Sequence, residues 1–329
     1  MNAESPRPNF FIVGGPKCGT TALYTYLSSH PDIFMCPIKE PQFFAADIFS
    51  HQRRIQTLPE YLSCFSGARN QSRLGEASTA YLGSRTAANE IRAFSPNSRI
   101  IIMLRNPVDV MYAEHSERVF GNMEHVLDFE AALLSHEPRR WRAGPFQGEV
   151  IIRLPYRELS HFPDQVRRYF DVFGRENVHA VLYDDFKTDT RKVYKDVLRF
   201  LAVDNSHDPS DYLPINANRR ARSVRAQQFL RYPPKHLQGL GRKVLPRALR
   251  TAIVSRLHRV NTVYECRPPM DHALRRRLEK EYEPGVAELG DLLGCDLAFW
   301  CKTNVPYSDR AGCAGVVDRR PSDRETRLS

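Results

Sequence analysis

The sequence predicts an α/β fold in which a central parallel sheet is flanked by helices on both faces and is followed by a helical C-terminal portion. Three observations support this prediction. Short apolar runs alternate with amphipathic segments of helical period up to about residue 216. A glycine-rich turn joins the first apolar run to the first helical segment, and the chain beyond residue 216 is strongly basic. Repeated strand–helix units imply parallel strands, because each helix crosses the sheet before the next strand begins.

The first element is a strand followed by a turn and a helix. Phe10–Val13 is an apolar run too short for a core helix, which indicates a buried strand. The glycine-rich segment 14–19 can bring its backbone close to a ligand, and Thr20 begins an apolar-periodic segment typical of a helix. Free N–H groups and the positive end of the dipole at a helix N-terminus favour an anion. The turn therefore predicts an anion site, although a plain strand-to-helix turn would have the same pattern.

This turn differs from the loop that binds nucleoside triphosphates. Gly14 to Gly19 fits the first half of the pattern G-x-x-x-x-G-K-[ST], but Thr20 stands where that pattern has its lysine. The lysine lies inside the turn instead, at Lys17. In a triphosphate site the lysine contacts the β- and γ-phosphates, and the next hydroxyl binds magnesium. The shifted lysine therefore favours an anion other than a triphosphate.

The segment after the first helix carries a charged pair. Ile33–Phe44 mixes apolar residues with prolines, which predicts an irregular crossing segment that displays Lys39 and Glu40. These two residues are either a solvated pair at a turn or a substrate-facing lysine with its neighbour. Leu58–Phe65 then predicts a short helix.

The second predicted strand ends in a carboxylate side chain. Ser72–Glu76 is this strand, and Glu76 lies at its carboxyl end, where open α/β sheets bind ligands. The alternative is a structural role, in which Glu76 is a partner of a helix N-cap at Ser78 or Thr79.

Arg105 follows the strongest strand signal in the chain. Arg85–Phe94 predicts an amphipathic helix, and Arg99–Leu104 then predicts a fully buried, central parallel strand. This strand ends at Arg105, with Pro107 placed to begin the next helix. A nucleoside triphosphatase would have a magnesium-binding aspartate at such a place. A guanidinium there favours a second anion, bound without a metal ion.

The next strand keeps a different chemistry open. Asn177–Tyr183 predicts a further buried strand, and Asp184 and Asp185 follow it directly. This pair could pass for a magnesium-binding aspartate, so an enzyme of nucleoside triphosphates stays possible as an alternative. Thr188–Leu201 predicts an amphipathic helix.

The C-terminal third of the chain is basic. Asn218–Arg225 is a dense basic run, Lys235–Arg259 is basic and favours helix, and Asp271–Leu293 predicts a pair of charged amphipathic helices. The run could be a solvated face, a lid over an anionic ligand or a nucleic-acid patch. Because no aromatic residues alternate with the arginines, nucleic acid is not expected as a partner. We predict that residues 1–8 are disordered, as are residues 302–329, which have little apolar content.

The amino-acid composition restricts the binding partners and the cellular location that we expect. The 48 Lys and Arg against 38 Asp and Glu give a net charge of +10 over 329 residues. This charge favours anionic partners: a nucleotide, a sulfated or phosphorylated substrate, an acidic membrane surface or nucleic acid. The seven cysteines show no C-x-x-C spacing, so neither a zinc site nor a disulfide framework is indicated. The absence of a leader pattern and of a long apolar stretch predicts a soluble, cytoplasmic protein without stable membrane insertion.

Four motifs in order resemble those of one enzyme family. They are PKCGTT after the first strand, KEPQFF, GEASTAYL and IIMLRNPVD. The chain is similar to sulfotransferases that use 3′-phosphoadenylyl sulfate (PAPS), especially the heparan sulfate N- and 3-O-sulfotransferase branch and its bacterial relatives. The similarity runs from Asn9 to about Trp300. It implies a P-loop-type three-layer fold and a single domain over residues 9–301, with residues 216–301 as its helical, basic portion.

The resemblance implies a role for each candidate residue and no metal ion. The turn would hold the 5′-phosphosulfate of PAPS, with Lys17 on the bridging oxygen, and Arg105 would hold the 3′-phosphate. Glu76 would be the base that takes a proton from an acceptor hydroxyl or amine. Lys39, beside Glu40, would lie near this acceptor, a carbohydrate or another small metabolite. The implied cofactor-binding residues are Pro16, Lys17, Cys18, Gly19, Thr20, Thr21, Arg105 and Ser116.

Two features depart from the family pattern. The family has a serine eight residues after the arginine, where this chain has Ala113. Ser116, which lies one helical turn further along, can take its place. The Lys/Gly/Arg-rich loop that closes over the nucleotide is not evident near Cys266, and Arg222 or Arg267 can replace it.

Two alternative functions remain at this point. One is a P-loop kinase-like phosphotransferase, which Asp184 and Asp185 would support. The other is a non-catalytic protein that binds a nucleotide or an acidic glycan, which Ala113 and the basic C-terminal portion would permit. The sequence predicts no particular oligomeric state.

Overall fold

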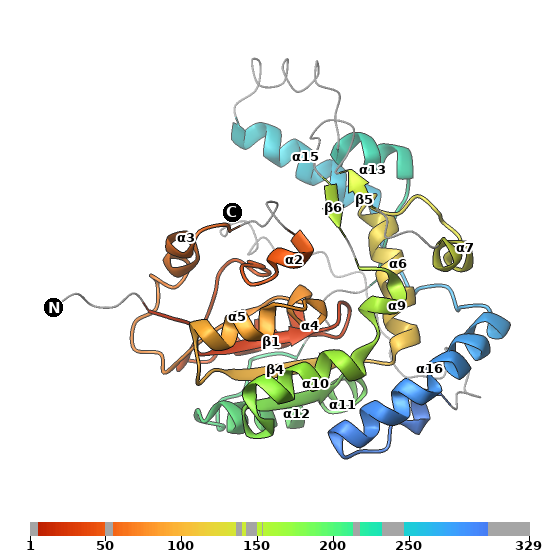
Figure 1. Ribbon diagram of the computed structural model, residues 1–329. Helices are drawn as coiled ribbons and strands as arrows, with labels where there is room; N and C mark the ends of the chain where they lie inside the picture. Colours follow the sequence, from red (N-terminus) through yellow and green to blue (C-terminus); the bar gives the residue numbers. More distant parts are fainter. Residues whose placement is uncertain are drawn as a thin grey trace.

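The computed structural model describes residues 6–49, 55–135, 140–142, 150–152, 154–212, 218–231 and 247–301. Its core is a five-stranded sheet with the strand order β2-β3-β1-β4-β7, and every neighbouring pair of strands is parallel (Figure 1). The five strands are β1 (Phe10–Gly14), β2 (Ile33–Met35), β3 (Arg73–Ala77), β4 (Arg99–Leu104) and β7 (Val178–Leu182). The predicted parallel sheet is confirmed.

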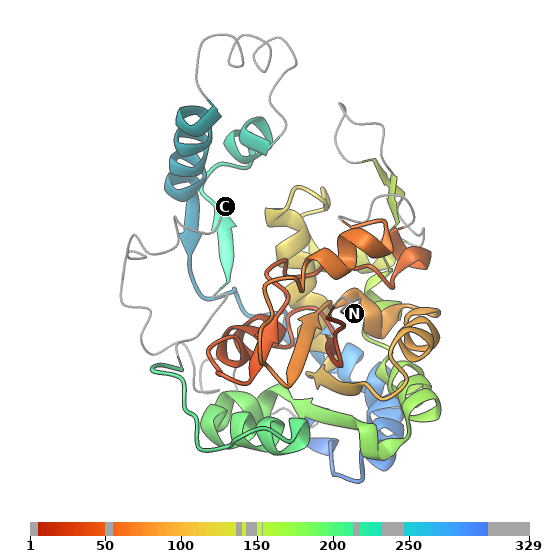
Figure 2. The same cartoon turned by 90° about the vertical axis from the view of Figure 1, so that its left-hand side faces the viewer.

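Helices cover both faces of the sheet. On one face α5 (Ala87–Phe94) packs against α10 (Phe162–Phe173), and on the other lie α1 (Thr20–Leu27) and α12 (Thr190–Leu201) (Figures 1 and 2). The apolar face predicted for α12 is buried. Every residue of β1 is also buried, as a strand between two helical layers requires.

The remaining elements of the first two thirds are short, apart from one long helix after β4. The long helix is α6 (Pro107–Phe120), which begins at Pro107 as predicted. The others are α2 (Ala46–Phe49), α3 (Leu58–Ser63), α4 (Ala80–Gly83), α7 (Phe129–Leu134), β5 (Arg140–Arg142), β6 (Val150–Ile152), α9 (Tyr156–Leu159), the 3₁₀ helix η2 (Arg175–Asn177) and α11 (Tyr183–Thr188).

We predicted irregular structure throughout Ile33–Phe44, but the first three residues of this segment form a strand. Ile33–Met35 forms the edge strand β2 and pairs with Arg73–Gly75 of β3. The prediction was wrong here because a strand of three residues between two prolines is too short to show an alternating pattern. The rest of the segment has no helix or strand.

The C-terminal portion differs from the prediction in two ways. Instead of two helices, His272–Leu293 forms one helix, α16, which continues through Pro284. A proline normally breaks a helix, but α16 packs along both α6 and α10, and these contacts hold its two halves in line. The basic portion is also not wholly helical, because β8 (Arg219–Ala221) pairs antiparallel with β9 (Thr262–Tyr264). A three-residue strand made mostly of arginine gives no periodic signal.

Two helices and a final turn complete the described chain. α13 (Val224–Arg231) and α15 (Arg247–Asn261) follow β8 and precede β9, and the 3₁₀ helix η3 (Ala298–Trp300) comes last. None of the helices in the described ranges is both long and apolar enough to cross a bilayer. The predicted disordered tail at residues 302–329 and the first five residues of segment 1–8 lie outside the described residues.

Candidate active site

The glycine-rich turn between β1 and α1 has an unusual backbone. Lys17 has a φ of 63° and Gly19 a φ of 91°, and both values lie in the left-handed region. A Cβ atom on Gly19 would lie 3.2 Å from the ring of Tyr183 and 3.3 Å from Met103, so glycine is required there by space as well as by backbone angle. Lys17 is not a glycine, so its left-handed backbone conformation is strained. Backbone strain at a non-glycine residue is typical of functional sites.

The N-terminus of α1 is open to an anion. Gly19 is its N-cap and offers no side chain to cap the helix, and no acidic residue lies in the first turn. The predicted helix start at Thr20 is confirmed. The thiol of Cys18 is fully buried, and burial raises its pKa to about 12. It therefore stays protonated, so Cys18 can serve an anion only through its backbone.

Arg105 lies directly against this turn. Its Nη1 donates a hydrogen bond of 3.1 Å to the backbone oxygen of Lys17, and its guanidinium lies over the ring of Tyr183 at 4.7 Å. Asp109, one turn into α6, lies 3.9 Å from Arg105 Nη2. The structure therefore places Arg105 against the backbone of the turn that carries Lys17, although the sequence predicted separate anion sites for the two residues.

Lys17 pairs with an acidic residue that the sequence analysis did not single out. Its Nζ lies 3.1 Å from Oε2 of Glu117 on α6, and Oε1 of Glu117 accepts a bond of 2.7 Å from Arg219 of β8. Burial raises the pKa of the Glu117 carboxyl, but the charges of Lys17 and Arg219 outweigh it and hold this pKa below its ordinary value. Glu117 is therefore ionised at neutral pH. Only its place on the helix that follows Arg105 could have drawn attention to it.

Glu76 is at the carboxyl end of β3, as predicted, and its side chain has no solvent exposure. It accepts hydrogen bonds from the hydroxyls of Tyr61 (2.5 Å), Ser78 (2.8 Å) and Tyr81 (2.9 Å). Burial raises the pKa of the Glu76 carboxyl to about 7, although the three hydroxyls act in the opposite direction. A pKa near neutrality suits a general base. Because the carboxylate is covered, an acceptor can reach it only if the side chains around it move.

Lys39 and Glu40 lie beside the same strand end. The Lys39 ammonium is 2.9 Å from the Glu40 carboxylate, and the backbone N–H of Glu40 donates to the oxygen of Ala77 at 3.0 Å. Glu40 also has a positive φ, of 59°. The segment that carries this pair therefore lies next to the end of β3, one residue beyond Glu76.

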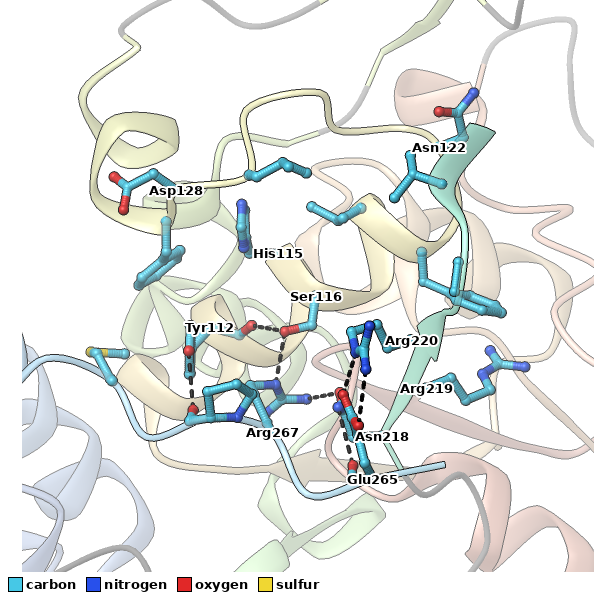
Figure 3. A pocket seen from close by; sticks show the side chains of 18 of the residues that line it. Tyr112, His115, Ser116, Asn122, Asp128, Asn218, Arg219, Arg220, Glu265 and Arg267 are labelled. Atoms are coloured by element: carbon cyan, nitrogen blue, oxygen red, sulfur yellow. Dashed lines mark hydrogen bonds and ion pairs between the residues drawn. The ribbon is translucent and has the colours of Figure 1, made fainter. Parts of the chain in front are cut away.

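Ser116 contacts one of the two arginines that the sequence analysis proposed as partners of the nucleotide. Its hydroxyl accepts a bond of 2.8 Å from Arg267 Nε and donates one of 3.1 Å to the oxygen of Tyr112, and Arg267 also donates to Asn218 at 3.1 Å (Figure 3). Arg222 is exposed, and its backbone N–H pairs with Asn261. Ala113 is buried in α6. Arg267 is thus the arginine that joins the C-terminal portion to Ser116.

A cavity of about 490 Å³ lies between α6, α7 and the two-stranded β8–β9 sheet (Figure 3). Its polar lining includes Ser116, Arg219, Arg220 and Arg267, and its apolar lining includes Phe129. Arg219 also holds Glu117, so the wall of the cavity is linked to Lys17 through one carboxylate. A small sugar-sized molecule fits this volume.

Asp184 has a structural partner. Its Oδ2 accepts a hydrogen bond of 2.8 Å from Nε1 of Trp300, which ties η3 to the start of α11. Among the residues that the structure describes, no group of three or more His, Cys, Asp and Glu side chains is arranged to hold a metal ion.

The comparison with family models decides the relationship. The model of the sulfotransferase domain matches residues 7–234, which include the turn, Glu76, Arg105 and Ser116. The chain belongs to the sulfotransferase family. The resemblance inferred from the four motifs is confirmed.

Individual sulfotransferases support this assignment. Human carbohydrate sulfotransferase 15 is 32% identical over an alignment of 246 residues, gaps included, that covers 59% of this chain and 43% of that protein. The bifunctional heparan sulfate N-deacetylase/N-sulfotransferase 1 of Xenopus laevis is 24% identical over 205 residues, which are 61% of this chain and 23% of that protein. The chain thus spans less than half the length of these curated relatives. A sulfotransferase crystal structure from Alicyclobacillus acidocaldarius is 30% identical with a TM-score of 0.66, and covers 90% of this chain and 99% of that one.

Proposed function

We propose that this protein transfers the sulfuryl group of PAPS to a hydroxyl or amine group of an acceptor. One observation carries the proposal. Arg105 donates to the backbone oxygen of Lys17 at 3.1 Å, so its guanidinium lies against the turn that leads into the uncapped N-terminus of α1. This arrangement suits a ligand with phosphate groups at both its 3′ and 5′ positions. Membership of the sulfotransferase family supports the same ligand.

The residues of the turn fit this nucleotide. PAPS supplies an activated sulfuryl group when bound. The backbone N–H groups of Cys18, Gly19, Thr20 and Thr21 and the dipole of α1 would hold its 5′ side, with Pro16 shaping the turn beside them, and Arg105 would hold its 3′-phosphate. Ser116 and Arg267 would add donors at the C-terminal side of α6.

Lys17 would change partner on binding. In this structure its ammonium is held by Glu117 at 3.1 Å. We propose that it turns to the bridging oxygen of the nucleotide, where negative charge grows as the sulfur–oxygen bond breaks. The leaving group is then the 3′,5′-bisphosphate. Its charge would be stabilised by Lys17 and by the α1 N-terminus.

Glu76 would act as the base. Its carboxylate takes the proton from the acceptor hydroxyl or amine while that atom forms its bond to sulfur. The pKa of about 7 supports this role, because such a carboxyl is partly ionised at neutral pH and binds a proton well. The burial of Glu76 requires that residues such as Tyr61 give way when the acceptor enters.

The acceptor is proposed to be a carbohydrate or another small metabolite. Support comes from the names of the carbohydrate and heparan sulfate sulfotransferases to which the chain is similar. The cavity between α6 and the two-stranded β8–β9 sheet is the proposed entry for it, with Lys39 and Glu40 on the side of β3. We also propose a cytoplasmic location, since the sequence has no C-x-x-C spacing and the described cysteines form no disulfide, as in a reducing compartment.

A transfer assay tests the proposal. Purified protein is incubated with PAPS and a panel of unsulfated oligosaccharides, and release of the 3′,5′-bisphosphate is followed. We expect turnover with at least one sugar, and a loss of about 100- to 1,000-fold in kcat/KM for Lys17→Ala. Lys280→Ala, an exposed lysine of α16, is the control and should behave as the parent protein. If Lys17→Ala were as active as the control, the assignment of the leaving-group site would be wrong.

A further inference from the structure

Helix α15 exposes a continuous apolar stripe. Leu249, Ile253, Leu257 and Val260 are 49%, 42%, 48% and 64% exposed. Their spacing of four, four and three residues places them along one side of the helix. An aligned row of large aliphatic side chains in water is uncommon on soluble proteins, whereas single exposed ones are ordinary.

Helix α13 adds to this surface. Phe229 is 50% exposed and Val224 is 47% exposed. The two helices lie together at one end of the molecule, away from the five-stranded sheet (Figures 1 and 2). We call the pair α13 and α15 the basic lobe.

In the basic lobe, amide side chains are buried and aliphatic side chains are exposed, which reverses the usual distribution. Gln227 and Asn261 are only 3% and 8% exposed and bond to each other at 3.1 Å, and Gln227 donates to the oxygen of Phe120 at 3.4 Å. Amides thus hold the lobe to the end of α6, while aliphatic side chains face out. This arrangement costs free energy in water unless something covers the apolar stripe.

The charge of the basic lobe restricts what can cover it. α13 and α15 together contain six arginines and no Asp or Glu. Arg222, Arg225, Arg256 and Arg259 are exposed, and none of them forms an ion pair with another residue of the described ranges. Arg256 and Arg259 lie next to the apolar stripe on α15. The partner must therefore offer both an apolar layer and negative charge.

We propose that the basic lobe docks on the surface of an anionic lipid bilayer. The aliphatic stripe would enter the boundary between headgroups and acyl chains, and the arginines would contact the anionic headgroups. α15 has 15 residues, so it is about 22 Å long and would lie in the plane of the membrane. A soluble polyanion would pair with the arginines but leave the stripe in water. A second copy of the chain would cover the stripe but bring arginines against arginines.

Vesicle co-sedimentation of the full chain tests this proposal. The probes are phosphatidylcholine vesicles with and without phosphatidylglycerol. We expect binding to the anionic vesicles only, weakened by salt. The double variant Ile253→Glu/Leu257→Glu should bind about tenfold or more weakly, because two aliphatic side chains no longer leave water. Arg256→Gln/Arg259→Gln should also bind about tenfold more weakly, with a smaller dependence on salt.

The controls separate loss of docking from loss of the fold. Leu58→Glu introduces one such negative charge at a 40% exposed leucine on α3 and should bind vesicles as the parent protein does. All variants should keep the parent melting midpoint. Three results would overturn the proposal: no binding of the parent chain to anionic vesicles, equal binding by the Ile253/Leu257 variant, or self-association that this variant abolishes. Binding to heparin but not to vesicles would identify a polyanion surface and would equally overturn it.

Discussion

Glu117 places a negative charge inside a site that we propose for a strongly anionic nucleotide. It holds the ammonium of Lys17 at 3.1 Å and the guanidinium of Arg219 at 2.7 Å. Without ligand, this carboxylate neutralises cations that would otherwise repel each other. With ligand, it must give up Lys17 and becomes a nearby like charge. Glu117 therefore opposes binding of the nucleotide while it keeps the empty site assembled.

Replacing Glu117 by glutamine should tighten the binding of 3′,5′-ADP. Removing one like charge a few ångströms from the phosphates is worth about 1 kcal/mol with water-like screening, which is about fivefold in Kd. Calorimetric titration measures it. Glu90→Gln on α5, remote from the turn, is the control and should leave Kd unchanged. Weaker binding by Glu117→Gln would show instead that the carboxylate positions Lys17 for the nucleotide.

Glu76 should make the stability of the folded protein depend on pH. The folded-state pKa is raised from 4.5 to about 7, so the folded protein keeps this proton where the unfolded chain has lost it. Its contribution is fully present below pH 4.5 and is lost as the pH rises through 7, a change of about 3 kcal/mol. Urea unfolding of the parent and of Glu76→Gln, compared from pH 5 to pH 8, measures it. As the pH rises, the free energy of unfolding of the variant should increase relative to that of the parent protein. An equal pH dependence of the two proteins would contradict this.

At the level of elements, the β1 turn and the N-terminus of α6 are fixed by local chemistry. Asn106 is the N-cap of α6 and accepts bonds from the N–H groups of Val108 and Asp109, while its Nδ2 donates to Trp300. This cap holds the start of the helix directly after Arg105. On the other side, Gly19 fixes the path of the turn into α1. Arg105 lies against the turn because the parallel neighbours β1 and β4 end at the same edge of the sheet.

Gly19→Ala should damage the site more than it damages the fold. Its φ of 91° disfavours any side chain, and the new Cβ would press on Tyr183, so we expect a stability loss of about 1–2 kcal/mol. Displacement of the α1 N-terminus should also weaken 3′,5′-ADP binding by about tenfold or more.

Gly294→Ala is a matched control for that change. Gly294 caps α16 with a φ of 71°, but nothing lies within 4 Å of its Cβ position and it is far along the chain from the turn. The Gly294→Ala variant should lose about as much stability as Gly19→Ala but keep its affinity for 3′,5′-ADP. Equal losses of affinity in the two variants would mean that the turn has no special role in binding.

For the whole molecule, the sequence predicts what is periodic or locally encoded. β4 was predictable because five residues in a row are apolar and buried, and the turn because glycines, a lysine and two threonines have a fixed order. Short strands such as β2 and β8 carry no period, so their pairing depends on distant partners. The single helix α16 could not be predicted across Pro284, since packing against α6 and α10 decides it.

The candidate site could also be predicted only in part from the sequence. Lys17 and Arg105 follow strands and Glu76 lies at the end of one, so the sequence could place them at one edge of the sheet. The burial of Glu76 under Tyr61 and the pairing of Glu117 with Lys17 depend on contacts between residues far apart in the chain. No pattern in the sequence encodes such contacts.

The central claim is that the Lys17 turn and Arg105 form one site for a 3′,5′-bisphosphate nucleotide. Its most direct test is the melting midpoint of the full chain titrated with 3′,5′-ADP, and in parallel with ATP and magnesium. A ligand at 100 times its Kd stabilises the folded state by about 2.7 kcal/mol. We expect the bisphosphate to raise the midpoint, and Lys17→Ala and Arg105→Ala to abolish the rise. A rise with ATP and magnesium alone would contradict the claim and favour a phosphotransferase.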